Sequence, residues 1–469
     1  MRPMATTPLD RLTHSQIYQF VYLTLFGVSV AMPACAQSQA VTPTLGLTSS
    51  FVKQANVVGT PSVGGSSRDW VTVFSPGLRV ASHGANLVVD GSVAFDAYHY
   101  ERGTLNDQIV PKGSVLAQLL SRESGLGLEA GWLSRQVPAQ FSSTSGAPNG
   151  EYTTTEWNVG PFIDKQLGAN TQLKAKLDRK VTHQSNQVAP NTTVTTASAV
   201  VNQNPMPFGY QLAVLDQDTK RAGSDTSLLK EFKSTANGSY ALTPEFDFGV
   251  IVGAESTDVQ AEPFRDTVYG WTLNWHPQSR TSLKAEVEKR FFGQAWQVDA
   301  THRMTWLTLG ATFSRQPSTS ATSQITNGRE LYNLTAQLRQ ESSGKMALIG
   351  QRDSMTFTAG RVDSTPLTQQ QSTQSTASRT RDYFFSSDWV HKLAPTWRLS
   401  NGLKWTRSHL TPAGQPYVFA REFAWRGELK TDLSPSAVAT LGLRKRIAHT
   451  TNYGDSAESA VFAGLDYAF

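Results

Sequence analysis

Apolar residues recur at every second position over much of this chain beyond residue 40, in stretches of about ten residues. That spacing is typical of a β-strand with one apolar and one polar face, because successive side chains of a strand point to opposite sides. No run of about eighteen consecutive apolar residues follows residue 40, so the pattern argues against membrane-spanning helices there. The alternation is clearest in residues 86–98, 172–178, 246–255, 268–275, 283–290 and 423–430.

The connections between these stretches are of two kinds, which tend to alternate along the chain. A soluble β-sandwich also alternates along its strands, but nothing in its architecture sorts connections by length. Outer-membrane barrels, in contrast, have short turns on one rim and long loops on the other. Short turns are predicted at 82–85, 122–125, 167–170, 243–245, 278–281, 394–396 and 434–436. Long loops are predicted at 53–68, 138–151, 187–225, 317–329 and 363–381.

The predicted fold is therefore all-β: a transmembrane antiparallel up-and-down β-barrel with short periplasmic turns and long extracellular loops. Counting strands between the predicted connections gives about 18–20 strands, within a range of about 16–22. An even number places both chain ends in the periplasm. Residues 331–340 fit either a short helix within a loop or an additional strand, and a turn is expected near 351–353.

Tryptophan is frequent near the ends of the predicted strands. The chain has 11 Trp, and amphipathic aromatic rings at strand ends form girdles at the two membrane interfaces. The alternative is that these rings pack inside a soluble core. The residues concerned are Trp70, Trp132, Trp157, Trp275, Trp306, Trp397 and Trp425.

The chain ends on an aromatic residue preceded by alternating apolar residues. This pattern resembles the signal that the barrel-assembly machinery recognises in outer-membrane proteins. Physically, the last strand must pair with the first, because an unpaired strand edge is not stable in lipid. The predicted assembly signal consists of Val461, Ala463, Leu465, Tyr467 and Phe469.

Residues 1–36 are predicted to be a secretory signal peptide, and residues 37–469 the outer-membrane β-barrel. Two arginines precede a short apolar stretch at 20–32, and small residues around Cys35 form a cleavage site. A buried N-terminal helix and a lipoprotein modified at Cys35 are the alternatives. Since Cys35 is the single cysteine, the mature chain is expected to have no disulfide and no thiolate metal site.

Composition argues against several classes of function. Charged residues make up 17% of the chain, below the roughly 25% of soluble domains, and the net charge is only +5. No basic stripe is present, so a nucleic-acid partner is not expected. The 9 His are scattered, with neither an H-x-x-x-H pair for a metal nor a glycine-rich phosphate loop. The sequence therefore predicts no enzyme, no cofactor and no metal.

Charged residues alternate with the apolar ones on several predicted strands. If the apolar face contacts lipid, the charges line the interior, because Arg or Lys at the bilayer midplane costs about 2–4 kcal/mol. They either pair with one another and fill a narrow lumen or line a water-filled channel of mixed charge, and the sequence leaves both open. The predicted lumen-lining residues are Lys174, Lys176, Asp178, Lys284, Glu286, Glu288, Arg290, Arg426, Glu428, Lys430, Arg444 and Arg446.

Residues 68–100 carry a family resemblance. Asp69 precedes a strand, Ser75-Pro76-Gly77 and a tight turn follow, and the next strand ends in Tyr98 and Tyr100. With the strand at 43–47 and the closing residues 464–469, this segment resembles the opening of a family of outer-membrane β-barrels. That family is associated with exopolysaccharide export and the PEP-CTERM sorting system, within the broader β-barrel porin group. The resemblance implies a role with a secreted polysaccharide and no catalytic residues.

The predicted function is a channel or scaffold of the cell outer membrane, associated with exopolysaccharide export or assembly by passive passage through a polar lumen. Hydroxyl, amide and aromatic groups suit sugars, because they bind by many weak contacts. Expected partners are outer-membrane lipid, the barrel-assembly machinery, and polysaccharide with its periplasmic export proteins. The alternatives are a general or solute-specific diffusion porin, a structural or adhesive barrel with a closed lumen and a partner-binding loop at 187–225, and a soluble periplasmic β-protein.

Overall fold

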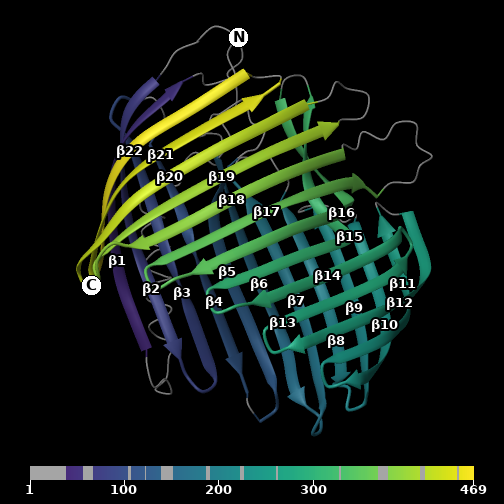
Figure 1. Cartoon of the computed structure of the whole chain (residues 1–469). Helices are drawn as coiled ribbons and strands as arrows, with labels where there is room; N and C mark the ends of the chain where they lie inside the picture. Colours follow the sequence, from purple (N-terminus) through teal and green to yellow (C-terminus); the bar gives the residue numbers. More distant parts are fainter. Residues whose placement is uncertain are drawn as a thin grey trace, which may run out of the picture.

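A computed structural model of the chain contains one closed sheet of 22 antiparallel strands (Figure 1). It describes residues 39–55, 67–103, 107–121, 123–138, 151–185, 191–221, 227–259, 262–326, 329–367, 379–411, 418–451 and 454–469. The predicted signal peptide and its cleavage site lie outside these residues.

The strands follow one another around the barrel in chain order. The first eleven are β1 (Gln39–Ala55), β2 (Ser67–His83), β3 (Leu87–Tyr100), β4 (Gln108–Leu120), β5 (Leu126–Pro138), β6 (Glu151–Gln166), β7 (Thr171–Gln184), β8 (Thr192–Gln203), β9 (Phe208–Arg221), β10 (Ser227–Thr243) and β11 (Phe246–Val259). The others are β12 (Glu262–Gln278), β13 (Thr281–Arg290), β14 (Gly293–Arg303), β15 (Leu307–Thr326), β16 (Arg329–Ile349), β17 (Asp353–Pro366), β18 (Arg379–Lys392), β19 (Trp397–Thr411), β20 (Val418–Ser434), β21 (Ala437–Thr450) and β22 (Gly454–Ala468).

Each strand pairs with its neighbours in sequence, and β1 pairs with β22 to close the barrel. The closing register runs from Thr44 opposite Ala468 to Ala55 opposite Ala457. The start of β1 and the end of β22 therefore lie at the same rim, where Phe469 donates a backbone hydrogen bond to Pro43. All the other connections at this rim are short turns, so we call it the short-turn rim and the opposite one the long-loop rim. The predicted all-β up-and-down barrel is confirmed.

The alternation identified most strands correctly, and all six of the clearest stretches lie in strands: β3, β7, β11, β12, β13 and β20. Two predicted loops were wrong. Residues 187–225 contain β8 and β9, joined by a turn at 204–207, and residues 317–326 belong to β15. Threonine, serine and small apolar residues fill β8 and residues 317–326, so their alternation is faint. In β9 the alternation of Phe208, Tyr210, Leu212 and Val214 is clear, and the prediction of a loop missed it. The strand count is consequently 22, the upper end of the predicted range.

Residues 330–362 contain two strands and the turn between them. Residues 331–340 form part of β16, not a helix, and the expected turn lies at 350–352. No helix among the described residues has the length and apolar character needed to cross a bilayer.

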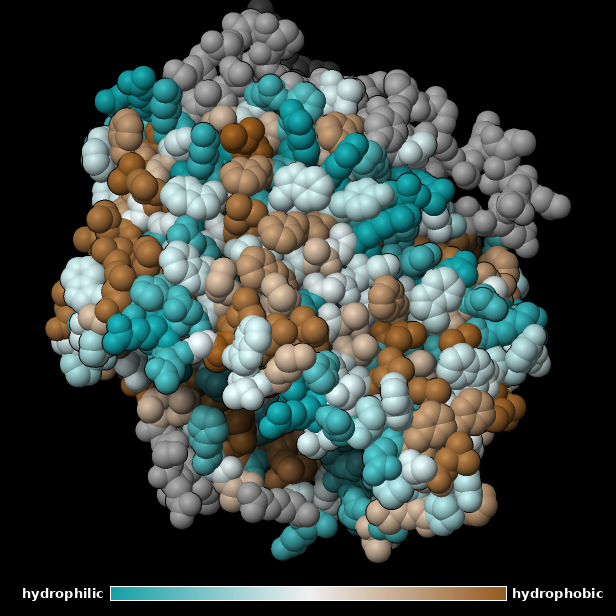
Figure 2. Space-filling model, viewed as in Figure 1, coloured by the Kyte–Doolittle hydropathy of each residue, from teal (hydrophilic) through white to brown (hydrophobic). Residues whose placement is uncertain are grey.

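One face of each strand presents apolar side chains to the surroundings, as β11 shows most clearly. Val250 and Val252 are 53% and 56% exposed, whereas their neighbour Ile251 is 4% exposed. In Figure 2, apolar side chains (brown) are spread over much of the visible wall. Because a soluble protein would bury such a large apolar surface, this outer face is suited to contact with lipid.

The prediction of tryptophans at strand ends is confirmed in part. Trp70, Trp275, Trp306 and Trp397 lie at or beside strand ends and are exposed. Trp157 is exposed but lies near the middle of β6, and Trp132 and Trp425 are half-buried near the middle of β5 and β20.

The predicted assembly signal shares one face of β22. Val461, Leu465, Tyr467 and Phe469 are exposed, while Phe462 between them is buried. Recognition of this strand by an assembly machinery remains a prediction.

Close packing between β3 and β4 requires a glycine. Gly113 has a φ of +137°, and an added Cβ would lie 2.0 Å from the carbonyl oxygen of Ser92 on β3. Backbone in this region is accessible to glycine at little cost and is strained for other residues. Position 113 therefore requires glycine for two reasons: its positive φ, and the Ser92 carbonyl oxygen that leaves no space for a Cβ.

We expect Gly113→Ala to lower the free energy of unfolding by about 1–3 kcal/mol, since the new side chain meets backbone and forces strain. Gly238→Ala is the matched control, because no atom lies within 4 Å of its added Cβ. The urea midpoint of each variant is measured by tryptophan fluorescence as the protein unfolds from lipid vesicles. Equal midpoints for the two variants would contradict this account.

Candidate functional site

The inner wall of the barrel carries the residues predicted to line the lumen. On β7, β13, β20 and β21 these residues lie on the face opposite the exposed apolar side chains such as Leu177 and Leu443. The structure divides them into three environments. Lys174, Lys284, Glu286, Arg426 and Arg444 are exposed, Lys176, Asp178, Lys430 and Arg446 are half-buried, and Glu288, Arg290 and Glu428 are buried.

Arg290 lies at the centre of a buried ion cluster near the long-loop rim. Its Nε donates to Glu255 of β11 over 2.7 Å, and its terminal nitrogen bonds to Glu231 of β10. Both carboxylates and the guanidinium are almost inaccessible to solvent. Beside them, Lys233 pairs with Glu288 over 2.5 Å. Because isolated buried charges are costly, this pairing is what allows them to stay in the interior.

The hairpin of β15 and β16 extends beyond its neighbouring strands at the same rim. Beyond Arg315 and before Gln337, the two strands pair only with each other, since β14 and β17 end earlier. At the base of the extension, Ala336 packs against Leu229 of β10 and Val259 of β11, and Gln337 is fully buried. Strands β10 and β16 are not neighbours in the sheet, so this contact joins two separate parts of the barrel wall near the long-loop rim.

The side of the lumen near the closing strands is more accessible. Arg426 pairs with the buried Glu428, which also accepts from Lys430 over 2.9 Å. Arg444 bonds to Glu458 over 2.9 Å. Even so, the side chains of Arg426 and Arg444 remain 62% and 43% exposed. The predicted charges on β20 and β21 thus form ion pairs and still face open space.

On β7, Lys176 joins Glu129 of β5 over 2.8 Å and Asp178 over 3.5 Å. Lys174 and Lys284 lie on the same inner face and are exposed.

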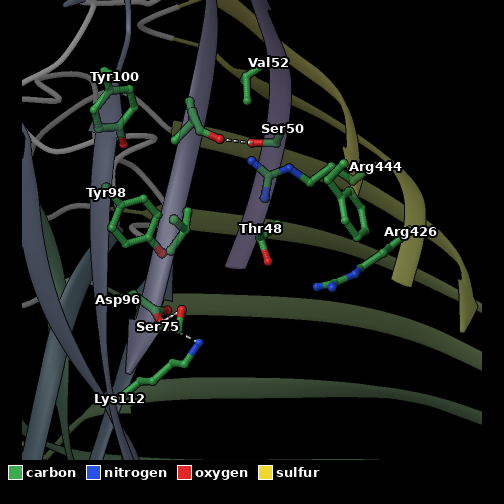
Figure 3. Close-up of a pocket in the computed structure, with 13 residues that line it drawn as sticks. Thr48, Ser50, Val52, Ser75, Asp96, Tyr98, Tyr100, Lys112, Arg426 and Arg444 are labelled. Carbon is green, nitrogen blue, oxygen red and sulfur yellow. Dashed lines mark hydrogen bonds and ion pairs between the residues drawn. The ribbon is translucent and has the colours of Figure 1, made fainter. Parts of the chain in front are cut away.

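A cavity of about 200 Å³ lies on the inner wall where β1 meets β22, and we call it the seam pocket. Strands β1 to β4 form one side, with Tyr98 and Tyr100 of β3 above Asp96. Lys112 of β4 pairs with Asp96 over 2.7 Å, and Ser75 donates to the same carboxylate over 2.6 Å. On the other side, Arg426 and Arg444 extend toward these strands (Figure 3).

The pocket combines cations with hydroxyl groups and aromatic rings. Its lining holds three cations and one carboxylate, and the guanidinium of Arg426 lies 5.1 Å from the ring centroid of Phe462. A guanidinium has five N–H donors, so one carboxylate partner leaves donors available to a solute. The hydroxyl of Ser50 donates to the carbonyl oxygen of Val71, which fixes the position of this hydroxyl in the pocket wall. Such a surface can bind hydroxylated or anionic solutes.

Sequence reasoning assigned two of the thirteen lining residues to the lumen. Arg426 and Arg444 were predicted because their strands alternate charge with apolar residues. Lys112 of β4 was not assigned to the lumen, because β4 has too few charges to reveal its inner face. Tyr98 and Tyr100 of β3 were considered only as part of the family resemblance. The strand register supplies the information that was missing. Lys112 lies opposite Ala94, and Ala94 shares one face of β3 with Asp96, a polar residue of the alternating stretch 86–98. Lys112 therefore lies on the same inner face as Asp96.

Comparisons with known proteins show the fold and no family. No protein-family profile and no curated protein matches the chain. The barrel is similar to the FrpB iron transporter from Neisseria meningitidis (F3-3 variant), with 10% identity over 91% of this chain and 81% of that one and a TM-score of 0.53. The siderophore receptor PirA from Acinetobacter baumannii is 8% identical over 91% and 80%, with a TM-score of 0.51.

Pseudomonas aeruginosa OccK9 (OpdG) is also similar, with 11% identity over 92% of this chain and 98% of that one, at a TM-score of 0.37. The likenesses to FrpB and PirA show the fold, a large β-barrel of the kind found in outer-membrane proteins. The resemblance of residues 68–100 to exopolysaccharide-associated barrels gains no support from them.

We expect Arg290→Met to lower the free energy of unfolding by about 3–5 kcal/mol, because Glu231 and Glu255 would be left buried without their cation. Lys284→Met on the same strand is the control, as Lys284 is exposed. Adding Glu231→Gln and Glu255→Gln to Arg290→Met should recover part of the loss. Urea unfolding in vesicles measures the free energy of unfolding of the wild type and of the three variants. An Arg290→Met variant as stable as the wild type would disprove the role assigned to the cluster.

Proposed function

We propose that the protein is a passive channel of the outer membrane, without enzymatic activity, through which hydrophilic solutes cross. The observation that carries this proposal is the contrast between the two sides of the lumen. On the β10–β13 side the charges around Arg290 are buried, whereas charged side chains around the seam pocket remain exposed inside a closed barrel. Exposed charges on an inner wall require water, so a water path along the seam is the simplest arrangement.

The mixed charge of that path supports a broad rather than ion-specific channel. Arg426, Glu428 and Lys430 follow one another along β20, and each cation is close to a carboxylate. Binding to such a wall is weak and distributed over many groups, which allows a solute to enter and leave. Since the sequence has no nucleotide-binding loop, any driving force would come from periplasmic or inner-membrane partners.

Sugars are the solutes that we propose, and an exported polysaccharide is the specific cargo. Tyr98, Tyr100 and the hydroxyl of Thr48 offer rings and hydrogen-bonding groups to a sugar, while Arg426 and Arg444 favour a carboxylated one. The resemblance of residues 68–100 to export-associated barrels points in the same direction. A solute-specific diffusion porin for free sugars would use the same chemistry. The size of the largest sugar that passes distinguishes such a porin from a polysaccharide channel.

A structural or adhesive barrel with a closed lumen is the competing function. Its proposed contact surface was a long loop at 187–225, but most of that segment forms β8 and β9 in the wall. The buried ion cluster on the β10–β13 side is the feature that favours a closed lumen. Conductance therefore decides between the two functions.

We expect the purified protein to conduct ions in planar bilayers. The double variant Arg426→Glu and Arg444→Glu should shift the reversal potential in a salt gradient toward cation selectivity, because both side chains face the proposed path. Lys230→Glu is the control, since Lys230 lies on the outer face of β10. Absence of conductance in correctly folded protein would reject the channel and favour the closed barrel.

Cargo size is tested on vesicles that contain the same protein. Swelling in galacturonate and in oligogalacturonates of increasing length reports the largest sugar that enters. Entry of monosaccharides alone identifies a diffusion porin, and entry of long chains supports polysaccharide passage.

A further inference from the structure

A row of directly paired residues crosses the outer face of β17 to β21. Arg361 of β17 lies opposite Tyr383 of β18, and Tyr383 lies opposite Arg407 of β19. Arg407 in turn lies opposite Arg421 of β20, and Arg421 opposite His449 of β21. Five adjacent strands thus present three arginines in one row of opposed residues, with Arg407 and Arg421 directly opposite each other.

This row lies between the apolar belt and the long-loop rim. One step toward the membrane centre, the corresponding row contains Trp405, Phe423 and Ile447, of which Trp405 and Ile447 are exposed. On the other side, β20 begins at Val418, three residues before Arg421. In Figure 2, hydrophilic side chains (teal) gather toward the upper right edge of the visible wall, over the long-loop ends of these strands. The central Arg407–Arg421 pair therefore lies on the long-loop side of the apolar belt, where lipid headgroups are expected.

The carboxylates of this face lie at the two ends of the row. Asp363 accepts from Arg381 over 2.6 Å and lies 2.5 Å from Arg361, and Asp455 pairs with His449. In the centre, Arg407 and Arg421 are exposed, and among the described residues neither forms an ion pair. The guanidinium of Arg407 instead lies 5.0 Å from the ring centroid of Phe419. Like charges directly opposite on adjacent strands destabilise a sheet.

We propose that Arg407 and Arg421 bind the phosphate of a glycolipid headgroup in the leaflet at the long-loop rim. A phosphate between them would replace their repulsion by charge-assisted hydrogen bonds, and a guanidinium binds phosphate with two parallel donors. The aromatic row beneath, with Trp405 and Phe423, contacts the upper part of the acyl chains. The surface thus matches a molecule with an anionic head above an apolar body.

Other parts of the outer face have a different charge balance. Lys230 of β10 is also exposed and faces outward, but its partners in the register are Asp258 on β11 and Asp218 on β9. A cation between two carboxylates needs no external anion. Lys230 therefore provides a control for the Arg407–Arg421 pair on the same barrel.

The test compares the protein in nanodiscs of phosphatidylcholine with nanodiscs that also contain bis-phosphorylated lipid A. Lipid A should raise the thermal unfolding midpoint of the wild type and of Lys230→Gln. Lipid A from which both phosphates have been removed, and free inorganic phosphate, should not raise it. In native mass spectrometry, Arg407→Gln with Arg421→Gln should bind lipid A about tenfold more weakly for each charge-assisted hydrogen bond that the substitutions remove.

The same double variant separates binding from general damage. In phosphatidylcholine alone it should be at least as stable as the wild type, because the substitution removes a repulsion. Its midpoint should then not respond to lipid A. An unchanged response, or an equal effect of dephosphorylated lipid A, would overturn the proposal. A response to free phosphate at matched concentration would also overturn it, since the site would then bind an ion and not a lipid.

Discussion

Closure of the backbone hydrogen-bond ladder is the constraint on which the rest of this structure depends. In a bilayer no water satisfies an unpaired strand edge, so β1 and β22 must pair along their length. Their twelve paired positions, from Thr44–Ala468 to Ala55–Ala457, join the two ends of the chain. This closure also creates the seam pocket, because Thr48 and Ser50 of β1 come to lie beside Phe462 of β22 and Arg444 of β21. The candidate site is thus a product of barrel closure.

The interior charges obey a second constraint, which is the cost of removing them from water. On β10, β11 and β13 the charges form a compact cluster around Arg290, with almost no contact with solvent. On β20 and β21, cations such as Arg426 pair with a carboxylate and still expose much of their side chain. The two arrangements occupy different parts of the same inner wall.

The outer face is organised by height above the bilayer centre. Valines and other aliphatic residues occupy the middle of β11, tryptophans appear toward the strand ends, and arginines stand beyond the aromatic row on β17 to β20. The placement follows from solvation, because lipid tails tolerate only apolar groups, whereas headgroups accept rings with polar edges and cations. The charge of the outer face is uneven around the barrel, and this unevenness distinguishes β17 to β21 from β10.

The sequence by itself determined the all-β class, the antiparallel hairpin order and the outward face of strands such as β11, because side chains of a strand alternate with a period of two residues. It also placed charges such as Arg426 and Arg444 on the inner face. It did not reveal β8, whose threonines and alanines differ too little in polarity to show two faces. The alternation of Phe208, Tyr210, Leu212 and Val214 in β9 was present in the sequence but lay within a segment assigned to a loop. Only the tertiary structure decided that Arg290 is buried while Arg426 is exposed, and that Arg407 opposes Arg421. Those relations depend on register and on contacts across the lumen, and a local pattern of residues contains neither.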